Sequence, residues 1–379
     1  MNEDIIRNLE KQIVDERARL SADRMDISFG ELVNLYKNNE LIIRPEYQRL
    51  FRWNNAQKTG LIESILLGIP VPPIFVAEDE DGIWELVDGL QRVTTIISFF
   101  GELDNTISND GKNLTIVDDY ENEEEVYDYL NKWVLEKGDL IPELEGFNCD
   151  TLPKKYIINI KRAVCRVEIL RGESNIAMKY ELFKRLNSGG SKLTAQEIRN
   201  AIYRGLNPKL NEMLERMAAN DSFINLTGLS EAKRKELYDQ ELVLRFIAFF
   251  NNAENINSNT ETFLDKFMEK CVNDDYFDYD SYEKIFTDVL SLLAALDDMS
   301  LFKNDRNTFV PALYEGILIG VAQNYELYKD NKSMLIERIN MLKNDGEFKS
   351  FSGSASNSKN RIKRRLTRAN EIFSNVEVC

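Results

Sequence analysis

The chain of 379 residues contains no histidine. This absence excludes centres that need an imidazole, such as the Ser-His-Asp triad, the Cys-His pair, the HNH nuclease and histidine-ligated metal sites. The four cysteines are far apart and form no CxxC pair, which argues against a disulfide framework or a zinc knuckle. No segment approaches the roughly 18 consecutive apolar residues of a membrane span, and residues 1–20 lack the apolar core of a secretory signal. We therefore expect a cytoplasmic protein with no membrane partner.

The charged residues are unevenly distributed along the chain. The net charge of −16 opposes unspecific binding to nucleic acid. However, residues 101–150 carry fifteen acidic side chains and three lysines, whereas residues 154–204 carry twelve basic side chains and four acidic ones. Residues 356–370 carry six basic side chains and no acidic one. Two interpretations remain open: a solvated acidic insertion with ordinary basic helix faces, or a basic surface that binds a phosphate-bearing ligand.

Hydrophobic periodicity predicts an α+β protein with two domains. Residues 1–205 are expected to form an α/β domain with an acidic insertion at about 101–150, and residues 206–379 an all-helical domain. Strands are expected at 41–43, 74–77, 83–87 and 163–170, and helices of the first domain at 4–20, 31–39, 54–67, 93–100, 176–186 and 193–203. The second domain is expected to hold helices at 208–219, 231–251, 260–272, 280–297, 309–328, 332–344 and 359–373.

The first motif that could carry chemistry is Arg44-Pro45-Glu46-Tyr47-Gln48-Arg49, followed by Trp53. Pro45 keeps the chain extended and prevents regular strand pairing. The resulting stiff loop would present the guanidiniums of Arg44 and Arg49 to an anion. Alternatively, the aromatic residues anchor the segment in the core and the two arginines form surface ion pairs.

The second motif, Asp88-Gly89-Leu90-Gln91-Arg92, lies between a predicted strand and a predicted helix. Gly89 permits a tight turn, the helix start offers unpaired backbone N–H groups, and Arg92 adds a positive charge, which together favour a phosphate cradle. Asp88 is a candidate for holding Mg²⁺ or for positioning a water molecule. The alternative is an ordinary Asp-Gly turn in which Asp88 caps the helix.

The third motif spans residues 187–200, where a Gly-Gly-Ser-Lys loop precedes a helix. Such a loop can surround an anion with backbone N–H groups, although its spacing is not that of a Walker A sequence. Part of the motif has a simpler explanation, because Thr194 and Glu197 fit a capping box.

A fourth segment, the basic stretch from Lys359 to Arg368, is expected to be helical. Its apolar residues lie on one face and its basic residues surround them. The segment is therefore either an ordinary docked surface helix or a helix that contacts a phosphate backbone through Lys363, Arg364 and Arg365.

Taken together, these motifs resemble the N-terminal domain of the GmrSD-type modification-dependent restriction proteins, a relative of the ParB/sulfiredoxin-like fold. The segments that carry the resemblance are RPEYQR at 44–49 with Trp53, LIESILLGIPVPPIFV at 61–76, LVDGLQRVTTIISFF at 86–100 and FKRLNSGGSKLTAQEIRNAIYRG at 183–205. Because the four segments occur in the same order as in the family, the resemblance is far more specific than any one of them. It extends over about residues 25–205 and the basic segment near the C-terminus.

The resemblance implies an Mg²⁺-dependent nucleoside triphosphatase that acts in phage defence on modified or phage DNA. The family's D-G-Q-Q-R motif is associated with binding and hydrolysis of nucleoside triphosphates. Carried over, the catalytic residues are Asp88, Gln91, Arg92 and Glu197, with Asp88 also as the metal ligand. The residues implied to bind the nucleotide (GTP, ATP or CTP) are Arg44, Arg49, Gly89, Arg92, Asn187 and Arg199.

Two departures from the family pattern limit what the resemblance implies. Leu90 stands where the family has its first glutamine, and a leucine side chain can neither orient water nor contact phosphate. Many relatives also carry an HNH nuclease domain, which a chain without histidine cannot reproduce, so we expect a nuclease partner subunit. Two alternative functions remain: a nucleotide-gated DNA-binding or scaffold protein, or a metal-dependent nickase that uses Asp88 and Glu197. Self-association into a homo-oligomer is a further expectation.

Overall fold

The computed structural model describes residues 3–19, 21–43, 53–103, 131, 133–171, 193–204, 206–250, 255–353 and 357–374. The chain divides into two compact units, Met1–Leu193 and Thr194–Cys379. Most of the predicted acidic insertion and the helix predicted at 176–186 lie outside the described residues. Within the described ranges, no helix combines the length and the apolar character needed to cross a bilayer.

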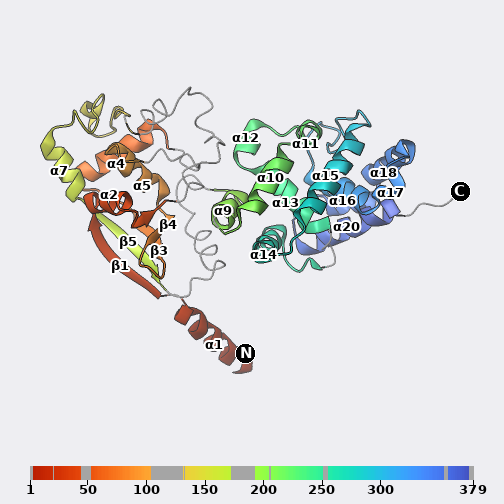
Figure 1. The fold of residues 1–379 in the computed structure, drawn as a ribbon, viewed down its shortest axis with the longest axis horizontal. Helices are drawn as coiled ribbons and strands as arrows, with labels where there is room; N and C mark the ends of the chain where they lie inside the picture. Colours follow the sequence, from red (N-terminus) through yellow and green to blue (C-terminus); the bar gives the residue numbers. More distant parts are fainter. Residues whose placement is uncertain are drawn as a thin grey trace. The chain divides into compact units, whose positions relative to one another are not determined.

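The first unit is an α/β domain, as the sequence predicted (Figure 1). Its elements are α1 (Glu3–Arg19), β1 (Ser21–Ser28), α2 (Phe29–Lys37), β2 (Leu41–Ile42), α4 (Asn55–Leu67), β3 (Ile74–Glu78), β4 (Trp84–Asp88), α5 (Leu90–Phe99), the 3₁₀ turn η1 (Pro142–Leu144), α7 (Lys154–Arg162) and β5 (Val164–Arg171). The strands form one mixed sheet in the order β1-β5-β3-β4-β2. Strands β3 and β5 pair in parallel, and so do β2 and β4, whereas the other two pairs are antiparallel.

The core of this unit lies between the sheet and its helices. Alternate residues of the central strands, such as Val76, Leu86 and Val167, are buried. Helices α2, α4, α5 and α7 pack against one another, and Figure 1 shows them together on one side of the sheet. Ile62 of α4 and Ile96 of α5 are fully buried in this layer. The sheet therefore fixes the position of the turn that follows β4.

Strand β1 was not expected from the sequence. It pairs with β5 so that Arg24 lies directly opposite Glu168, and Asp26 directly opposite Arg166. Both pairs form ion pairs, with N–O distances of 3.0 Å for Arg24–Glu168 and 3.2 Å for Arg166–Asp26. Opposite charges at directly facing positions stabilise an antiparallel pair. The strand thus depends on its partner and not on an apolar pattern of its own.

The second unit is built of helices, which confirms the predicted class. They are α9 (Ala195–Tyr203), α10 (Pro208–Ala218), α11 (Asp221–Thr227), α12 (Glu231–Lys235), α13 (Tyr238–Phe250), α14 (Thr260–Val272), α15 (Tyr279–Ala294), α16 (Pro311–Gln323), α17 (Tyr325–Tyr328), α18 (Lys332–Asn344), α19 (Gly346–Phe351) and α20 (Lys359–Ser374). The helix predicted at 231–251 is divided into α12 and α13, because Leu237 adopts a left-handed backbone conformation with φ of 56°. Helices α11 and α19 were not predicted.

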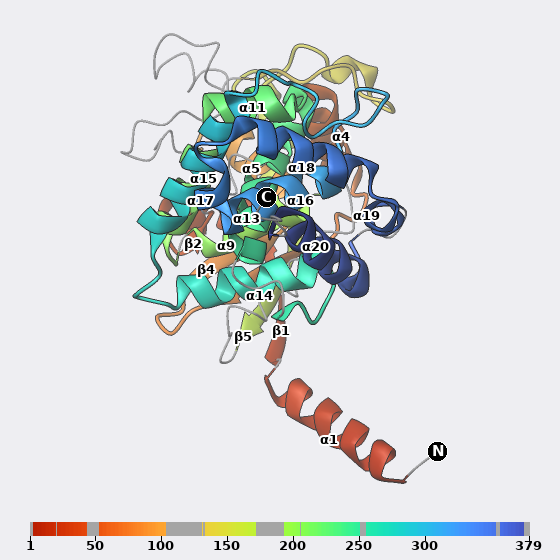
Figure 2. The same ribbon diagram turned by 90° about the vertical axis from the view of Figure 1, so that its right-hand side faces the viewer.

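Helices α13 and α16 form the centre of the second unit. Residues 242–244 and 246–249 of α13 and residues 314–321 of α16 are buried, so both helices are covered on all sides. Figures 1 and 2 both show α13 and α16 in the middle of this unit. A helix buried all round is typical of the core of a larger protein. Polar side chains on these two helices must therefore find partners inside the unit.

The division between the units differs from the predicted boundary at residue 205 by one helix. Helix α9 packs against α10, α13 and α14, all of which belong to the second unit. Ile198 and Tyr203 of α9 are buried there. The helix that contains Glu197 and Arg199 is therefore part of the helical unit.

Candidate functional site

The Asp88–Arg92 turn connects β4 to α5, as the sequence predicted. Gly89 has a φ of 99°, a left-handed conformation that side chains disfavour. A Cβ atom at this position would lie 2.7 Å from Cγ2 of Ile74. Gly89 is also the N-cap residue of α5, and it has no side chain that could accept a hydrogen bond from the first turn of the helix. The start of α5 therefore has no cap from the side chain of its N-cap residue.

Asp88 and Arg92 form the charged part of this turn. Nη2 of Arg92 lies 3.2 Å from Oδ2 of Asp88 and donates to the carbonyl oxygen of Pro73 at 3.1 Å. The Nε of Arg92 is buried and has no hydrogen-bond partner among the described residues. Burial raises the pKa of the Asp88 carboxyl, and the nearby Arg92 acts in the opposite direction. An unpartnered guanidinium nitrogen is the kind of donor that a phosphate oxygen satisfies.

Gln91 joins the first motif to the second. Its Oε1 accepts a hydrogen bond from the backbone N–H of Trp53 at 3.1 Å. Trp53 follows the segment that contains Arg44 and Arg49, two residues that lie outside the described part of the chain. The structure therefore brings the end of the first motif to the start of α5. A catalytic role for Gln91 stays a prediction.

The third motif begins α9 with a capping box. The backbone N–H of Thr194 donates to Glu197 Oε2 at 2.7 Å, and the backbone N–H of Glu197 donates to Thr194 Oγ1 at 3.2 Å. The Glu197 side chain is buried, at 1% exposure. This reciprocal pair confirms the simpler explanation of the motif. Asn187 lies outside the described residues.

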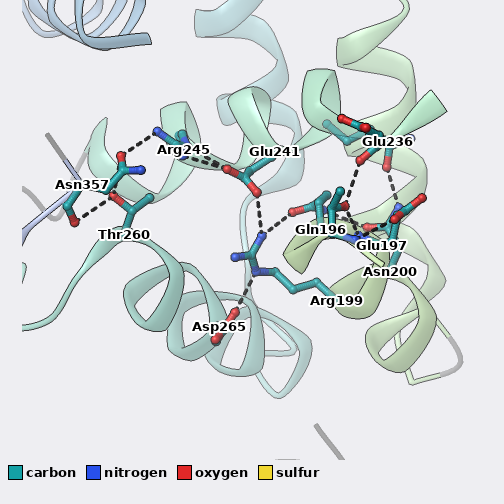
Figure 3. Close-up of polar contacts among 12 residues, drawn as sticks. Gln196, Glu197, Arg199, Asn200, Glu236, Glu241, Arg245, Thr260, Asp265 and Asn357 are labelled. Atoms are coloured by element: carbon teal, nitrogen blue, oxygen red, sulfur yellow. Dashed lines mark hydrogen bonds and ion pairs between the residues drawn. The ribbon is translucent and has the colours of Figure 1, made fainter. Parts of the chain in front are cut away.

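Arg199, implied by the resemblance to bind the nucleotide, lies in the core of the second unit (Figure 3). Its Nε donates to Asp265 Oδ1 and its Nη1 to Gln196 Oε1, both at 2.8 Å, and Nη1 lies 3.4 Å from Glu241 Oε2. Burial alone would raise the pKa of Glu241, but the guanidiniums of Arg245 and Arg199 together lower it. Arg199 therefore joins α9 to α13 and α14 and does not present its guanidinium at the surface.

The same chain of charges continues to Arg365 of α20. Arg245 donates to Glu241 at 2.8 Å on one side and to Glu315 at 2.8 Å on the other. Arg365 donates through Nε to Glu315 Oε2 at 2.9 Å, and both side chains are fully buried. This corrects the expectation that Arg365 contacts DNA, because its guanidinium is enclosed in the core. Lys363 and Arg364, the other two expected contacts, are exposed.

The residues expected to form one nucleotide site thus fall into different units. Asp88, Gln91 and Arg92 lie in the first unit, whereas Glu197 and Arg199 lie in the second. In the second unit, the capping box and the buried ion pairs already engage these two side chains. Of the predicted residues that the structure describes, the turn that ends β4 is the part that remains suited to bind an anion.

Lys58 of α4 is a candidate that the sequence analysis missed. Its side chain is buried, burial lowers its pKa to about 8, and its Nζ lies 4.9 Å from the centre of the Trp133 ring. A lysine with a lowered pKa is a recurring feature of functional sites, but it also occurs in structural cores. The sequence feature that could have identified Lys58 is its helical spacing, because Lys58 lies on the same face of α4 as the buried Ile62 and Ile65.

No cluster of three or more acidic or cysteine side chains that could hold a metal ion occurs within the described ranges. Asp88 is the carboxylate of the candidate site. Magnesium in nucleotide sites is commonly held by one or two carboxylates together with phosphate oxygens and water. The turn therefore fits a metal ion that arrives with a phosphate ligand, and it does not form a complete cage for a metal ion alone.

Comparison with known proteins identifies a family for the first half of the chain. Residues 29–204 match the family model described as GmrSD restriction endonuclease, N-terminal domain. No curated protein and no solved structure matches the chain. The matched segment includes the Asp88–Arg92 turn and ends one residue after α9.

Proposed function

We propose that this chain, whose residues 29–204 belong to the family of GmrSD restriction endonuclease N-terminal domains, is the nucleotide-binding subunit of an anti-phage system that restricts modified DNA. The domain type indicates a role in a restriction system and contact with DNA. The finer proposal concerns the turn between β4 and α5. There, a nucleoside triphosphate with Mg²⁺ binds and is hydrolysed.

The observation that supports this site most directly is the Nε of Arg92, which is buried and has no hydrogen-bond partner among the described residues. It lies at the start of a helix that has no side-chain cap. A phosphate oxygen would accept from the guanidinium and from the first backbone N–H groups of α5 at the same time, and the helix dipole favours an anion at this end. One ligand group would therefore bind both the Arg92 guanidinium and the uncapped start of α5.

Asp88 would hold the Mg²⁺ that accompanies the nucleotide. The bound ion would neutralise phosphate charge and polarise the bond that breaks. Without the ion, the carboxylate of Asp88 would repel a phosphate bound to the same turn. The metal and the nucleotide are therefore expected to bind together, and Asp88→Asn should weaken binding of the Mg²⁺ complex more than binding of the metal-free nucleotide.

Isothermal titration calorimetry with GTP, ATP and CTP in the presence of Mg²⁺ tests the proposal. Arg92→Ala removes a charge-assisted contact worth about 1.5–3 kcal/mol, so affinity for the best nucleotide should fall about tenfold or more. Arg171→Ala is the matched control. It removes the same charge from the same unit, at an exposed position of β5. A folded Arg92→Ala protein that binds the nucleotide as tightly as the parent would refute the site.

A second function, nucleotide-gated binding without turnover, is favoured by one residue. Leu90 is the first residue of α5 and is half-buried. It offers no polar group to orient water, at the position where the family has glutamine. Release of inorganic phosphate distinguishes the two functions: a nucleotide that binds but is not hydrolysed, with or without DNA, would favour the scaffold protein.

The nickase alternative has less support than the other two. It requires Glu197 as a second carboxylate beside Asp88, whereas Glu197 is buried in the capping box of α9. Because the chain also lacks histidine, cleavage by an HNH centre would need another protein. We therefore include a nuclease partner subunit in the proposal.

A further inference from the structure

The second unit contains a pocket lined by aromatic residues that the proposed function does not use. The pocket has a volume of about 570 Å³ and lies between the end of α13, the C-terminal half of α14 and the start of α15. Pockets of about 300–1,000 Å³ commonly hold small molecules. Its aromatic walls include Phe250, Phe267, Phe277 and Tyr282.

The rings of these residues are set at right angles around a stacked pair. Phe277 and Tyr282 stack with their centres 5.1 Å apart and an angle of 7° between their planes. Phe267 meets Phe277 at 77°, and Phe250 meets Tyr282 at 78°. Rings that meet at right angles can direct both faces and edges at a bound group. The electron-rich face of an aromatic ring attracts a cation.

Acidic side chains outnumber basic ones in the segment around the pocket. Residues 269–283 contain six acidic side chains and one lysine, a net charge of −5. Two of the acids, Asp274 and Asp278, line the pocket itself together with Lys270, so the lining carries a net charge of −1 and the remaining acids surround it. Hydrogen bonds from the side chain and backbone of Ser281 lower the pKa of Asp278, which keeps its carboxylate ionised at neutral pH. Such a field favours cations and opposes phosphate-bearing ligands.

We propose that this pocket binds a small organic cation, with an ammonium or guanidinium group held against the ring faces and balanced by Asp274. Binding of a stacked nucleobase is the main competing explanation for the aromatic walls. Sites that stack single-stranded nucleic acid pair their aromatic residues with a basic groove, whereas this pocket lies in an acidic surface. The charge therefore decides in favour of the cation.

Choline and its uncharged isostere 3,3-dimethyl-1-butanol provide the test. The two molecules have nearly the same shape, so a difference in affinity reports the contribution of the charge. Titration of the full chain, followed by calorimetry or by ligand NMR, should show choline binding at least about tenfold more tightly than the alcohol. Rising salt should weaken choline binding and leave the alcohol unchanged.

Two substitutions locate the binding site. Tyr282→Leu removes a ring face and should reduce choline affinity several-fold, whereas Tyr282→Phe should preserve it. Asp274→Asn removes the charge but keeps the acceptor that bonds the backbone N–H of Tyr276, so it tests the pocket even if Tyr282→Leu fails to fold. Asp305→Asn, at an exposed loop position in the same unit, is the control for loss of one negative charge.

Three results would overturn the proposal. The first is equal binding of choline and the alcohol. The second is choline binding that Asp274→Asn and Tyr282→Leu leave unchanged. The third is binding of adenosine or cytidine in the absence of any binding of choline, which would assign the pocket to a base. A peptide carrying trimethyllysine, run beside free choline, distinguishes a protein-borne cation from a free one.

Discussion

Gly89 stands where β4 ends and α5 begins, and two separate effects disfavour a side chain there. Its φ of 99° lies in the left-handed region, and an added Cβ would approach Ile74 Cγ2 to 2.7 Å. Strain of this kind costs about 1–3 kcal/mol, and the close contact with a buried residue adds to it. Gly89→Ala should therefore lower the free energy of unfolding by about 2 kcal/mol or more, measured by urea denaturation.

Gly82 provides the matched control for this prediction. Its φ of 81° is also left-handed, but an added Cβ would meet nothing within 4 Å. Gly82→Ala therefore carries the backbone strain alone, and the difference between the two variants measures the contact with Ile74. If both variants lose the same stability, Ile74 yields readily and the tight approach has no energetic role.

Single residues also show what the sequence could not predict. The Asp88–Gly89 turn was predictable because a strand pattern, a glycine and a helical pattern follow one another directly. The burial of Arg199 and Arg365 was not, because their partners come from distant positions. Asp265 lies 66 residues from Arg199, and Glu315 lies 50 residues from Arg365. A basic residue within a basic segment gives no local sign that it will be enclosed.

Among the elements, α20 packs on α16 through an apolar face and a buried ion pair between Arg365 and Glu315. Arg365→Ala would leave Glu315 fully buried, with Arg245 as its remaining basic partner among the residues described. Removing one partner of a buried pair costs about 3–5 kcal/mol, because the other charge stays out of water. We expect a loss of this size in thermal or chemical denaturation. Arg364→Ala, on the exposed side of the same helix, should cost less than about 0.5 kcal/mol.

Equal effects of these two substitutions would contradict the structure. They would indicate that α20 is held by its apolar face alone, through residues such as Ile362 and Phe373. A double-mutant cycle with Glu315→Gln separates the ion pair from the packing around it.

Most of the helices and strands were predictable because their apolar spacing is regular, whereas the missed elements are short or rich in charged residues. Strand β1 reads SADRMDIS, in which the apolar alternation is limited to Met25 and Ile27. It forms because β5 supplies hydrogen bonds and opposite charges. Helix α7 is amphipathic, but its nine residues bury a single side chain, Ile160, and so short a stretch does not stand out in the sequence. In both cases tertiary partners decide the local structure.

For the molecule as a whole, the net charge of −16 restricts DNA contact to local basic faces. On α7, Lys154 and Lys155 are exposed, and no ion pair joins them to an acid among the described residues; on α20, Lys363 and Arg364 are exposed. Each phosphate contact adds about 0.9 to the slope of log affinity against log salt. Replacing either pair by alanine should lower that slope by about 2 if the pair contacts DNA, as measured by gel shift or fluorescence anisotropy.

The control is the double variant Lys284→Ala/Arg306→Ala, which removes two positive charges at exposed positions outside α7 and α20. If one DNA molecule contacts both α7 and α20, removing both pairs should lower the slope by the sum of the two effects. A slope that changes equally for the basic faces and the controls would show that general charge, and not a contact, governs DNA affinity.

Any fragment of this chain that ends where the family match ends, at residue 204, would separate α9 from the unit that holds it. Thr194 donates its hydroxyl to the carbonyl of Glu236, and Arg199 neutralises the half-buried Asp265. Without α9, the helical unit would keep these acceptors and lose their donors, and it would expose apolar surface prone to aggregation. For expression and crystallisation in pieces, the cut should therefore fall before Thr194, eleven residues inside the end of the segment that defines the family.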